Sequence, residues 1–415
     1  MNKKISLKEL CLEDEWGKYG IPASAEDYDI EKTRYLRITD ISEDGELLNN
    51  DKKSVSAPDI DKYLLKDGDI VFARTGNSTG KSYYHEDKNG KLAFAGFLIK
   101  YSLDKAKVNP KYIKFFTITN EYKNWVKNLS VGSTRGNINA QTFGDCPISV
   151  PERKQQDLLV RTLSLIIDKI ELNNRINAEL EAMAKTIYDY WFVQFDFPYD
   201  FSQGKPDKNG RRSEPAELKP YKTSGGKMVW NEELKRDVPE GWEVKCLGDY
   251  AQIKKGVLIT EKTANINGNV KVVSAGLDFS YYHSESNYPE NTITISASGA
   301  SAGFINFWRE PIFACDCTTV RGKTIADTLQ ILGFLKMRQD FIYNQARGSA
   351  QPHVYPKDIE GLLFPIPPSD LVIKYGKLVV TGNEKIAINL KENQQLASLR
   401  DWLLPMLMNE QVKVG

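Results

Sequence analysis

The sequence predicts a duplicated α/β (α+β) protein in which two similar domains are each followed by a long helix. Three observations lead to this fold. The second half of the chain repeats the first at a constant offset, short β-rich runs precede each repeated block, and each block ends in apolar residues at heptad spacing. Two equivalent domains joined by a spacer point to a ligand with two parts.

The internal repeat is clearest in one segment near the middle of the chain. DKIELNNRINAEL, residues 168–180, returns as EKIAINLKENQQL, residues 384–396, at an offset of 216 positions. The same offset, without a gap, matches further identical residues in the pairs Gly132/Gly348, Ser133/Ser349 and Pro151/Pro367. A loop, a proline and a long helix therefore recur as one block.

The first domain is predicted to span residues 1–150. Runs such as RYLRITDIS, GDIVFAR and LAFAGFLIKYSL are short, β-rich and separated by turn residues. One helix is expected over Pro110–Leu129, where the pattern changes to helical periodicity. These elements together are typical of a compact α/β domain.

A long helix is predicted over residues 151–194, because apolar residues there step alternately by four and by three. Pro151 supplies a helix-start signal, and about 40 helical residues would extend about 60 Å. The heptad seam of this helix consists of Leu159, Leu163, Ile166, Ile170, Asn173, Asn177 and Leu180. Such a helix can serve as a spacer.

Residues 195–240 are polar and punctuated by Pro and Gly, which predicts a connecting segment with little core of its own. A second α/β domain is expected over residues 241–366, with strands near NVKVVSAG, NTITISAS and PIFACDCTTV and a helix around Thr328–Gln345. Cys315 and Cys317 are expected to be buried thiols in the last of these strands.

The second long helix is predicted over residues 367–410, and its seam consists of Ile386, Asn389, Asn393, Leu396 and Leu403. Gly382 and Arg400 interrupt this seam, and the first turns are expected to be the weaker part, since an interior Gly costs about 1 kcal/mol relative to Ala. Asparagines at seam positions are tolerated mainly where they fix register with a partner, which favours packing of the two helices on each other. The alternative is two unrelated amphipathic helices, each lying on its own domain.

The composition of the 415-residue chain narrows the class of function. Lys and Arg total 56 against 55 Asp and Glu, so the net charge is only +1, and a DNA-binding protein of this kind would need help from partners. No charged leader or long apolar run is visible, and the cytoplasm is the expected compartment, without a membrane. Five cysteines and three histidines show no paired metal-ligand spacing, so no metal site is expected.

The most prominent chemical motif is RTGNSTGKS, residues 74–82, which approaches the phosphate-binding P-loop pattern. Thr75 stands where that pattern requires the first glycine. An offset of 223 positions aligns Gly80 with Gly303, matches Gly76 to Gly299 and puts Phe304 in place of Lys81. The recurring element is therefore a glycine turn, and with no other catalytic motif in the chain the protein is predicted to bind rather than to catalyse.

Two loops suggest what is bound. VGSTRGNINAQTF, residues 131–143, and RGSAQPHVYPKDI, residues 347–359, both combine Gly and Ser with Arg, Asn, Gln or His. These side chains can contact base edges and phosphates. Each loop alone could be a solvated polar turn, but repetition at the same place before the same helix favours a function.

The sequence resembles the specificity subunits of type I restriction-modification enzymes along nearly its whole length. The resemblance is carried by VPEGWEVKCLGDYA (residues 238–251), GDIVFARTGNSTGK (68–81), GSTRGNIN (132–139) and the segment from PISVPERKQQDLL through the first long helix. Each pattern is soft by itself, whereas their order and duplication are specific.

The resemblance implies two target recognition domains, each reading one half of a bipartite double-stranded DNA site. It implies that the two long helices form an antiparallel coiled coil that sets the gap, and that an approximate two-fold axis relates the halves. Two methyltransferase subunits would carry out the S-adenosylmethionine chemistry. Restriction/translocase subunits would bind ATP and Mg and would carry out ATP hydrolysis and cleavage. No cofactor is expected on this chain, and because the two domains differ, the target should be asymmetric.

The residues that we expect to contact DNA lie in the glycine turns, in the repeated loops and near the strand ends. In the first half they are Arg74, Thr75, Asn77, Ser78, Lys81, Ser133, Thr134, Arg135, Asn137 and Asn139. In the second half they are Ser298, Ser301, Arg321, Lys323, Arg347, Ser349, Gln351 and His353. The alternatives to a specificity subunit are a stand-alone sequence-specific DNA-binding regulator and a non-catalytic coiled-coil adaptor.

Overall fold

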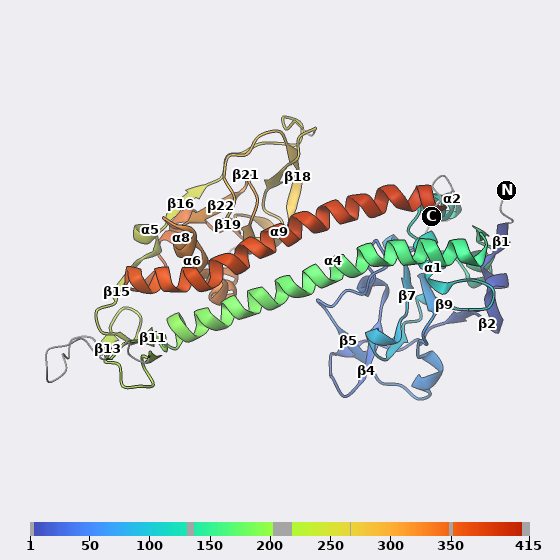
Figure 1. The fold of residues 1–415 in the computed structure, drawn as a ribbon, viewed down its shortest axis with the longest axis horizontal. Coiled ribbons are helices and arrows are strands. Elements are labelled where there is room, and N and C mark those ends of the chain that lie inside the picture. The colour runs from blue at the N-terminus through green and yellow to red at the C-terminus, as the bar shows by residue number, and fades with distance from the viewer. Residues whose placement is uncertain (1–3, 131–136, 202–217, 266, 348–351, 409–415) are drawn as a thin grey trace. The chain divides into compact units, whose positions relative to one another are not determined.

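The computed structural model describes residues 4–130, 137–201, 218–265, 267–347 and 352–408. The chain divides into two compact units (Figure 1). The first unit comprises residues 1–171 and 394–415, and the second unit comprises residues 172–393. Both boundaries fall inside long helices, so each unit contains one part of either helix. Across the described residues, no helix combines the length and the apolar character that a membrane span requires.

Among its described residues, the first unit forms three sheets. Its strands are β1 (Lys4–Ser6), β2 (Cys11–Tyr19), β3 (Glu26–Asp27), β4 (Thr33–Leu36), β5 (Lys53–Val55), β6 (Asp69–Ala73), β7 (Ser82–Tyr84), β8 (Leu92–Phe94), β9 (Leu98–Leu103) and β10 (Pro147–Ser149). They pair in the orders β2-β9-β6-β7, β3-β5-β4-β8 and β1-β10. The helices α1 (Pro110–Phe116), α2 (Asn120–Ser130) and α3 (Ala140–Gly144) lie between β9 and β10 in the chain.

The second unit repeats this arrangement. After residue 240 its strands are β15 (Glu243–Cys246), β16 (Gln252–Lys255), β17 (Val270–Val273), β18 (Phe279–His283), β19 (Thr292–Ser296), β20 (Ile305–Trp308), β21 (Ile312–Ala314), β22 (Cys317–Arg321) and β23 (Leu363–Ile366). They pair in the orders β16-β22-β19-β20, β18-β17-β21 and β15-β23. Its helices are α5 (Leu247–Tyr250), α6 (Ile325–Met337), α7 (Gln339–Arg347) and α8 (Pro356–Glu360).

The duplication predicted from the sequence is confirmed in the sheet that contains β6 or β19, whereas among the described residues the sheet β3-β5-β4-β8 has one strand more than its counterpart β18-β17-β21. The four-stranded sheets have the same order, with β6 and β19 in equivalent interior positions, and both of these strands are buried along their whole length. In each unit one pair is parallel, β4 with β8 and β17 with β21. Cys315 and Cys317 are buried, as predicted, but the run expected as one strand forms β21 and β22, and Cys315 lies between them.

Two predicted helices are each broken into two. The stretch expected as one helix over Pro110–Leu129 forms α1 and α2, and the stretch around Thr328–Gln345 forms α6 and α7. The break in the first unit has a local cause, because the Thr119 hydroxyl accepts a hydrogen bond from the Tyr122 amide at 3.3 Å, as a helix N-cap does. A threonine within an apolar helical pattern was therefore the start of a new helix.

The prediction that the segment after the first long helix has little core was wrong. Among its described residues, this segment forms β11 (Pro198–Tyr199), β12 (Lys219–Pro220), β13 (Met228–Asn231) and β14 (Arg236–Pro239). The Phe197 ring stacks at 4.8 Å from Tyr221 and at 5.7 Å from Trp242. Phe195 is buried in the same cluster. Burial of large aromatic rings stabilises the segment despite its polar composition.

The two long helices are α4 (Arg153–Tyr188) and α9 (Ser369–Met408). Within the first unit Leu159 and Leu163 of α4 share a core with Leu404 and Leu407 of α9. The part of α4 nearest its start thus packs on the end of α9, as an antiparallel pair requires. All the predicted seam residues are buried or half-buried.

Within the second unit the helices pair through asparagines. The Asn173 amide donates to the Asn393 side chain at 2.9 Å, and Asn389 donates to Asn177 at 2.8 Å. The residue numbers rise along one helix as they fall along the other, so the pairing is antiparallel here too. The predicted packing of the helices on each other is confirmed, and the alternative of two separate amphipathic helices is not.

The first turns of α9, which the sequence predicts to be its weaker part, are helical and well packed. Those turns bury Leu371, Val372, Tyr375 and Val379 in the core of the second unit. At Gly382 a Cβ atom would lie 3.6 Å from Leu180 Cδ2, an ordinary packing distance. A small side chain would therefore fit at Gly382, and packing of the neighbouring residues offsets the low helix propensity of glycine.

Candidate nucleic-acid interface

The same glycine turn follows the central strand of each unit. In the first unit β6 leads into a 3₁₀ turn at Gly76–Ser78 and then into β7, and in the second unit β19 leads into Gly299–Ser301 and then β20. Gly76 and Gly80 have φ of 73° and 90°. Gly299 and Gly303 have φ of 74° and 88°. These left-handed conformations explain why glycine recurs at both positions.

The hydrogen bonds of this turn show why it is not a P-loop. In the first unit the amide of Gly80 donates to Ala73 O at 2.8 Å, and the amide of Lys81 donates to Ser78 O at 2.9 Å. A P-loop binds phosphate through free backbone amides and leads from a strand into a helix. Here those amides are already bonded, and the turn joins two strands.

The loop that precedes α3 or α8 returns beside the glycine turn in both units. The Ile138 amide donates to Arg74 O at 2.9 Å, and the Val354 amide donates to Ala297 O, also at 2.9 Å. These residues correspond pairwise, because an offset of 216 takes Ile138 to Val354 and an offset of 223 takes Arg74 to Ala297. One backbone bond therefore joins the two repeated elements in each unit.

Arg74 is the centre of a polar cluster in the first unit. Its guanidinium lies 5.1 Å from the centroid of the Tyr19 ring, and its Nε donates to Asn137 Oδ1 at 3.3 Å. The Tyr19 hydroxyl in turn accepts a hydrogen bond from the Ala140 amide at 3.2 Å. The end of β2, the glycine turn and the repeated loop thus meet at one place, where the half-buried Arg74 lies beside the exposed residues Tyr19 and Asn137.

Other predicted residues of the first unit have distinct positions. Asn139 accepts a hydrogen bond from the Thr142 amide at 2.9 Å, so its side chain caps α3. Thr75, Asn77 and Ser78 lie in the turn itself. Ser133, Thr134 and Arg135 lie outside the described residues.

The second unit carries different side chains at the equivalent place. The Ser298 hydroxyl donates to Asp316 at 2.6 Å, and Ser298 forms an isolated β-bridge with His353. The His353 ring stacks on Tyr355 with centroids 5.8 Å apart. Ser301 ends the 3₁₀ turn. The result is a carboxylate, an imidazole and a phenol in place of the arginine and amide of the first unit.

Arg321 and Lys323 are not brought to this cluster. Ser296 pairs with Cys317 at the turn end of β22, whereas Arg321 is at the other end of that strand, where it pairs with Gln252. The Arg321 guanidinium donates to Glu290 O at 2.8 Å and to the Thr292 hydroxyl at 2.6 Å. Arg347 is the last residue of α7, and Ser349 and Gln351 lie outside the described residues.

Comparison with known proteins identifies the family. The model of the type I restriction modification DNA specificity domain matches residues 2–182 and 239–397. The chain belongs to this specificity family. The two matched ranges fall on the two repeats found in the sequence and in the strand order.

Curated relatives and a solved structure agree with this family assignment. The chain is 25% identical over 339 residues to the type I restriction enzyme MjaIX specificity subunit of Methanocaldococcus jannaschii, covering 75% of this chain and 71% of the relative. It is 23% identical over 420 residues to the HindI specificity subunit of Haemophilus influenzae, covering 85% and 88%. The crystal structure of the type I S subunit from M. genitalium has the same fold, with a TM-score of 0.57 at 18% identity over 98% of this chain and 95% of that one.

In this specificity-family chain, sequence reasoning missed Tyr19 and Asp316. Tyr19 contacts the repeated loop at Ala140, and Asp316 contacts the glycine turn at Ser298, and both contacts arise only after the sheets have formed. Tyr19 had one detectable signal, because it is an exposed aromatic residue at the end of a strand, and 43% of it remains accessible. Asp316 stands between the two cysteines in the apolar run IFACDCTTV, whose pattern indicates burial and not a contact with the turn.

Proposed function

We propose that this chain is the DNA specificity subunit of a type I restriction-modification enzyme and reads an asymmetric bipartite site, one half with each unit. The observation that carries the proposal is the backbone bond that joins loop to turn in both units, while the side chains beside it differ. Arg74 corresponds to Ala297, Lys81 to Phe304 and Asn137 to His353. One scaffold with two sets of polar side chains is suited to two different half-sites.

The partners follow from the family. The chain acts with two methyltransferase subunits and with restriction/translocase subunits, and S-adenosylmethionine, ATP and Mg belong to those partners. The chain itself carries out no methylation, cleavage or ATP hydrolysis. A net charge of +1 supports this division, since the partners then supply much of the positive charge that DNA phosphates require.

The test is to co-express the chain with its methyltransferase subunit and to sequence the methylated positions in host DNA. We expect one motif made of two unlike half-sites with an unread gap. Replacing Arg74 with Ala should relax the motif in one half only, because a bidentate base contact contributes about 1 to 3 kcal/mol of discrimination. His353→Ala should relax the other half.

Each competing function gives a different result in this experiment. A stand-alone regulator would protect its specific site with the purified chain alone and would leave no methylated motif. A coiled-coil adaptor would give methylation without a shared motif. If both variants relax the same half-site, the assignment of one half to each unit is wrong.

A further inference from the structure

A hollow of about 400 Å³ lies beside the glycine turn of the first unit. Its wall includes three lysines and one carboxylate, namely Lys81, Lys123, Lys127 and Glu43. Gly76 and Asn77 of the turn line the same hollow. The glycine turn therefore borders both the Arg74 cluster and this lysine-lined hollow.

The lysines are positioned by close packing of α2 on the turn. Lys123 and Lys127 are four residues apart on α2, so they lie on one face of that helix. A Cβ atom at Gly80 would lie only 2.5 Å from Val126 Cγ1, so the absence of a side chain lets the helix approach. The Tyr122 hydroxyl donates to Gly80 O at 2.8 Å, and burial raises the pKa of Tyr122 well above its usual value, which keeps this donor protonated.

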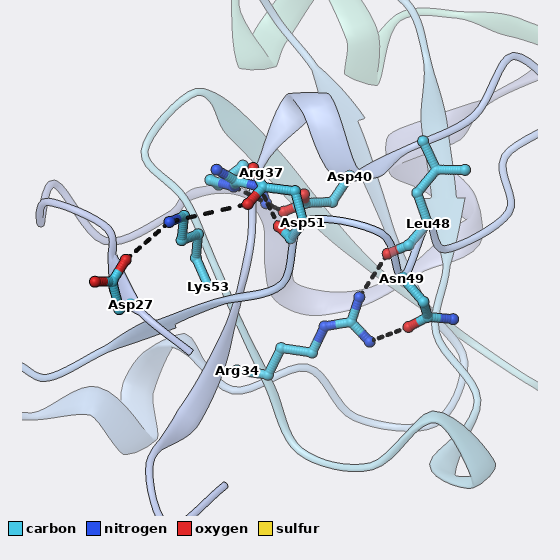
Figure 2. A network of polar contacts seen from close by, with 8 residues as sticks. All are labelled: Asp27, Arg34, Arg37, Asp40, Leu48, Asn49, Asp51 and Lys53. Atoms are coloured by element: carbon cyan, nitrogen blue, oxygen red, sulfur yellow. Dashed lines mark hydrogen bonds and ion pairs between the residues drawn. The ribbon is translucent and has the colours of Figure 1, made fainter. Parts of the chain in front are cut away.

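Glu43 is held at the mouth of this hollow. Its carboxylate lies 2.7 Å from Lys81 Nζ, and 79% of the Glu43 side chain is exposed, against 21% of Lys81. The far end of the loop that carries Glu43 is anchored by the network in Figure 2, where Arg34 donates to Leu48 O at 2.6 Å. Arg37 donates to Asp40 at 2.7 Å and ties the near end.

The three lysines of this hollow are not repeated in the second unit. The positions that correspond to Lys81, Lys123 and Lys127 are occupied by Phe304, Gln339 and Tyr343. Gln339 donates to Gly303 O at 2.7 Å and accepts from the Ile305 amide at 3.0 Å. Its side chain is therefore bonded to the backbone beside the glycine turn. The three lysines are therefore specific to the first unit.

We propose that this hollow binds a backbone phosphate of the DNA, with Lys81, Lys123 and Lys127 as its ligands and Glu43 as an internal anion that the phosphate displaces. The proposal rests on the proposed function and adds to it. Ammonium groups on flexible stems bind phosphate as point charges and carry no base information. The first unit thus contributes sequence-independent affinity that the second unit lacks at this place.

The test measures binding of the assembled complex with its methyltransferase subunits to DNA that carries the methylated motif, over a series of salt concentrations. In Lys123→Gln/Lys127→Gln the slope of log affinity against log salt should become shallower by about 0.9 for one lost phosphate contact. The loss should be equal on DNA without the motif. Lys62→Gln is the matched control, since Lys62 is another exposed lysine of this unit, paired with Asp59 at 2.9 Å and absent from the hollow.

Glu43→Gln gives the opposite expectation. Without the internal anion, affinity at low salt should rise by about two- to five-fold, the range of an exposed ion pair. An unchanged salt slope in the double lysine variant, or a loss of affinity in Glu43→Gln, overturns the phosphate site. Neither result affects the proposed function, which fails separately if the wild-type complex leaves no bipartite methylation motif.

Discussion

The two units share the backbone of their glycine turns and differ in the side chains that the turns present. Gly80 donates to Ala73 O and Gly303 donates to Ser296 O, both at 2.8 Å. Beside these identical bonds one unit has Arg74, and the other has Ala297. The fold requires the geometry of the turn, whereas its side chains can change with the half-site that is read.

The support beneath the turn repeats as well. An added Cβ at Gly80 would meet the side chain of Val126, and one at Gly303 would meet Ile342. Val126 and Ile342 are equivalent residues, separated by 216 positions on α2 and α7. The contact is closer in the first unit, at 2.5 Å against 3.2 Å. The same Gly→Ala substitution should therefore have a different effect on stability in each unit.

The largest expected effect follows from this contact. Gly80→Ala should destabilise the first unit by about 4 kcal/mol, because backbone strain at positive φ adds to overpacking against Val126. Gly303→Ala should cost about 2 kcal/mol, since the contact there is looser. Gly76→Ala is the control, with positive φ but nothing within 4 Å of the added atom, and should cost about 1 kcal/mol. Urea unfolding of the three variants measures the series, and equal losses would show that the helix contact is unimportant.

The helix pairing differs between the units in a second way. In the first unit the helices meet through leucines, whereas in the second they also pair through Asn177 and Asn389, which are almost fully buried. Asn389→Ala removes the donor to Asn177 and should cost about 2 kcal/mol, because a buried acceptor loses its partner. Asn177→Leu/Asn389→Leu should recover this loss, since it also removes the Asn389 oxygen that has no partner among the described residues.

Thermal unfolding of the single and double variants checks this expectation. If the double variant is no more stable than the single one, the asparagines contribute packing shape rather than paired polar groups. If the double variant is as stable as the wild type, the asparagines serve to fix the register of the two helices, because a pair of leucines tolerates a shift between the helices that a pair of hydrogen-bonded amides does not. The polar pairing would then be a feature of specificity in folding and not of stability.

Much of the fold was predictable because its signals are local and periodic. The seam of α4 and α9 and the repeat offset can be read without knowing any tertiary contact. The broken helices were missed because Thr119 changes from a helix residue to a cap only when its hydroxyl bonds to Tyr122. The aromatic cluster was missed although FDFPYDF places aromatic residues at alternate positions from Phe195, because polar composition outweighed that pattern.

The candidate site was predictable to a smaller extent. Arg74 and Asn137 were found because they stand in repeated motifs, and the structure joins them by a hydrogen bond. Tyr19 is 121 residues from Ala140, the residue its hydroxyl contacts, and no local pattern encodes such a contact. Arg321 was selected for its charge, but which end of β22 it occupies depends on strand pairing.

The smallest effect that we predict concerns acid. His85 lies directly after β7 and is buried, and burial lowers its pKa from the ordinary value of 6.5, more than the nearby Asp69 raises it. The equivalent position after an offset of 223 is Trp308, which does not titrate. As the pH falls, the unfolded chain therefore binds a proton at His85 at a higher pH than the folded first unit does. The contribution of His85 to the free energy of unfolding is present in full above about pH 6.5 and is lost as the pH falls toward the lower pKa of the folded state. His85→Gln should unfold at urea concentrations that change less between pH 7.5 and pH 5.5 than those of the wild type. Trp308→His would introduce an unpaired buried imidazole into the second unit, so the stability of this variant should depend more strongly on pH than that of the wild type. If the wild type and His85→Gln show equal pH dependence, other groups govern the acid response.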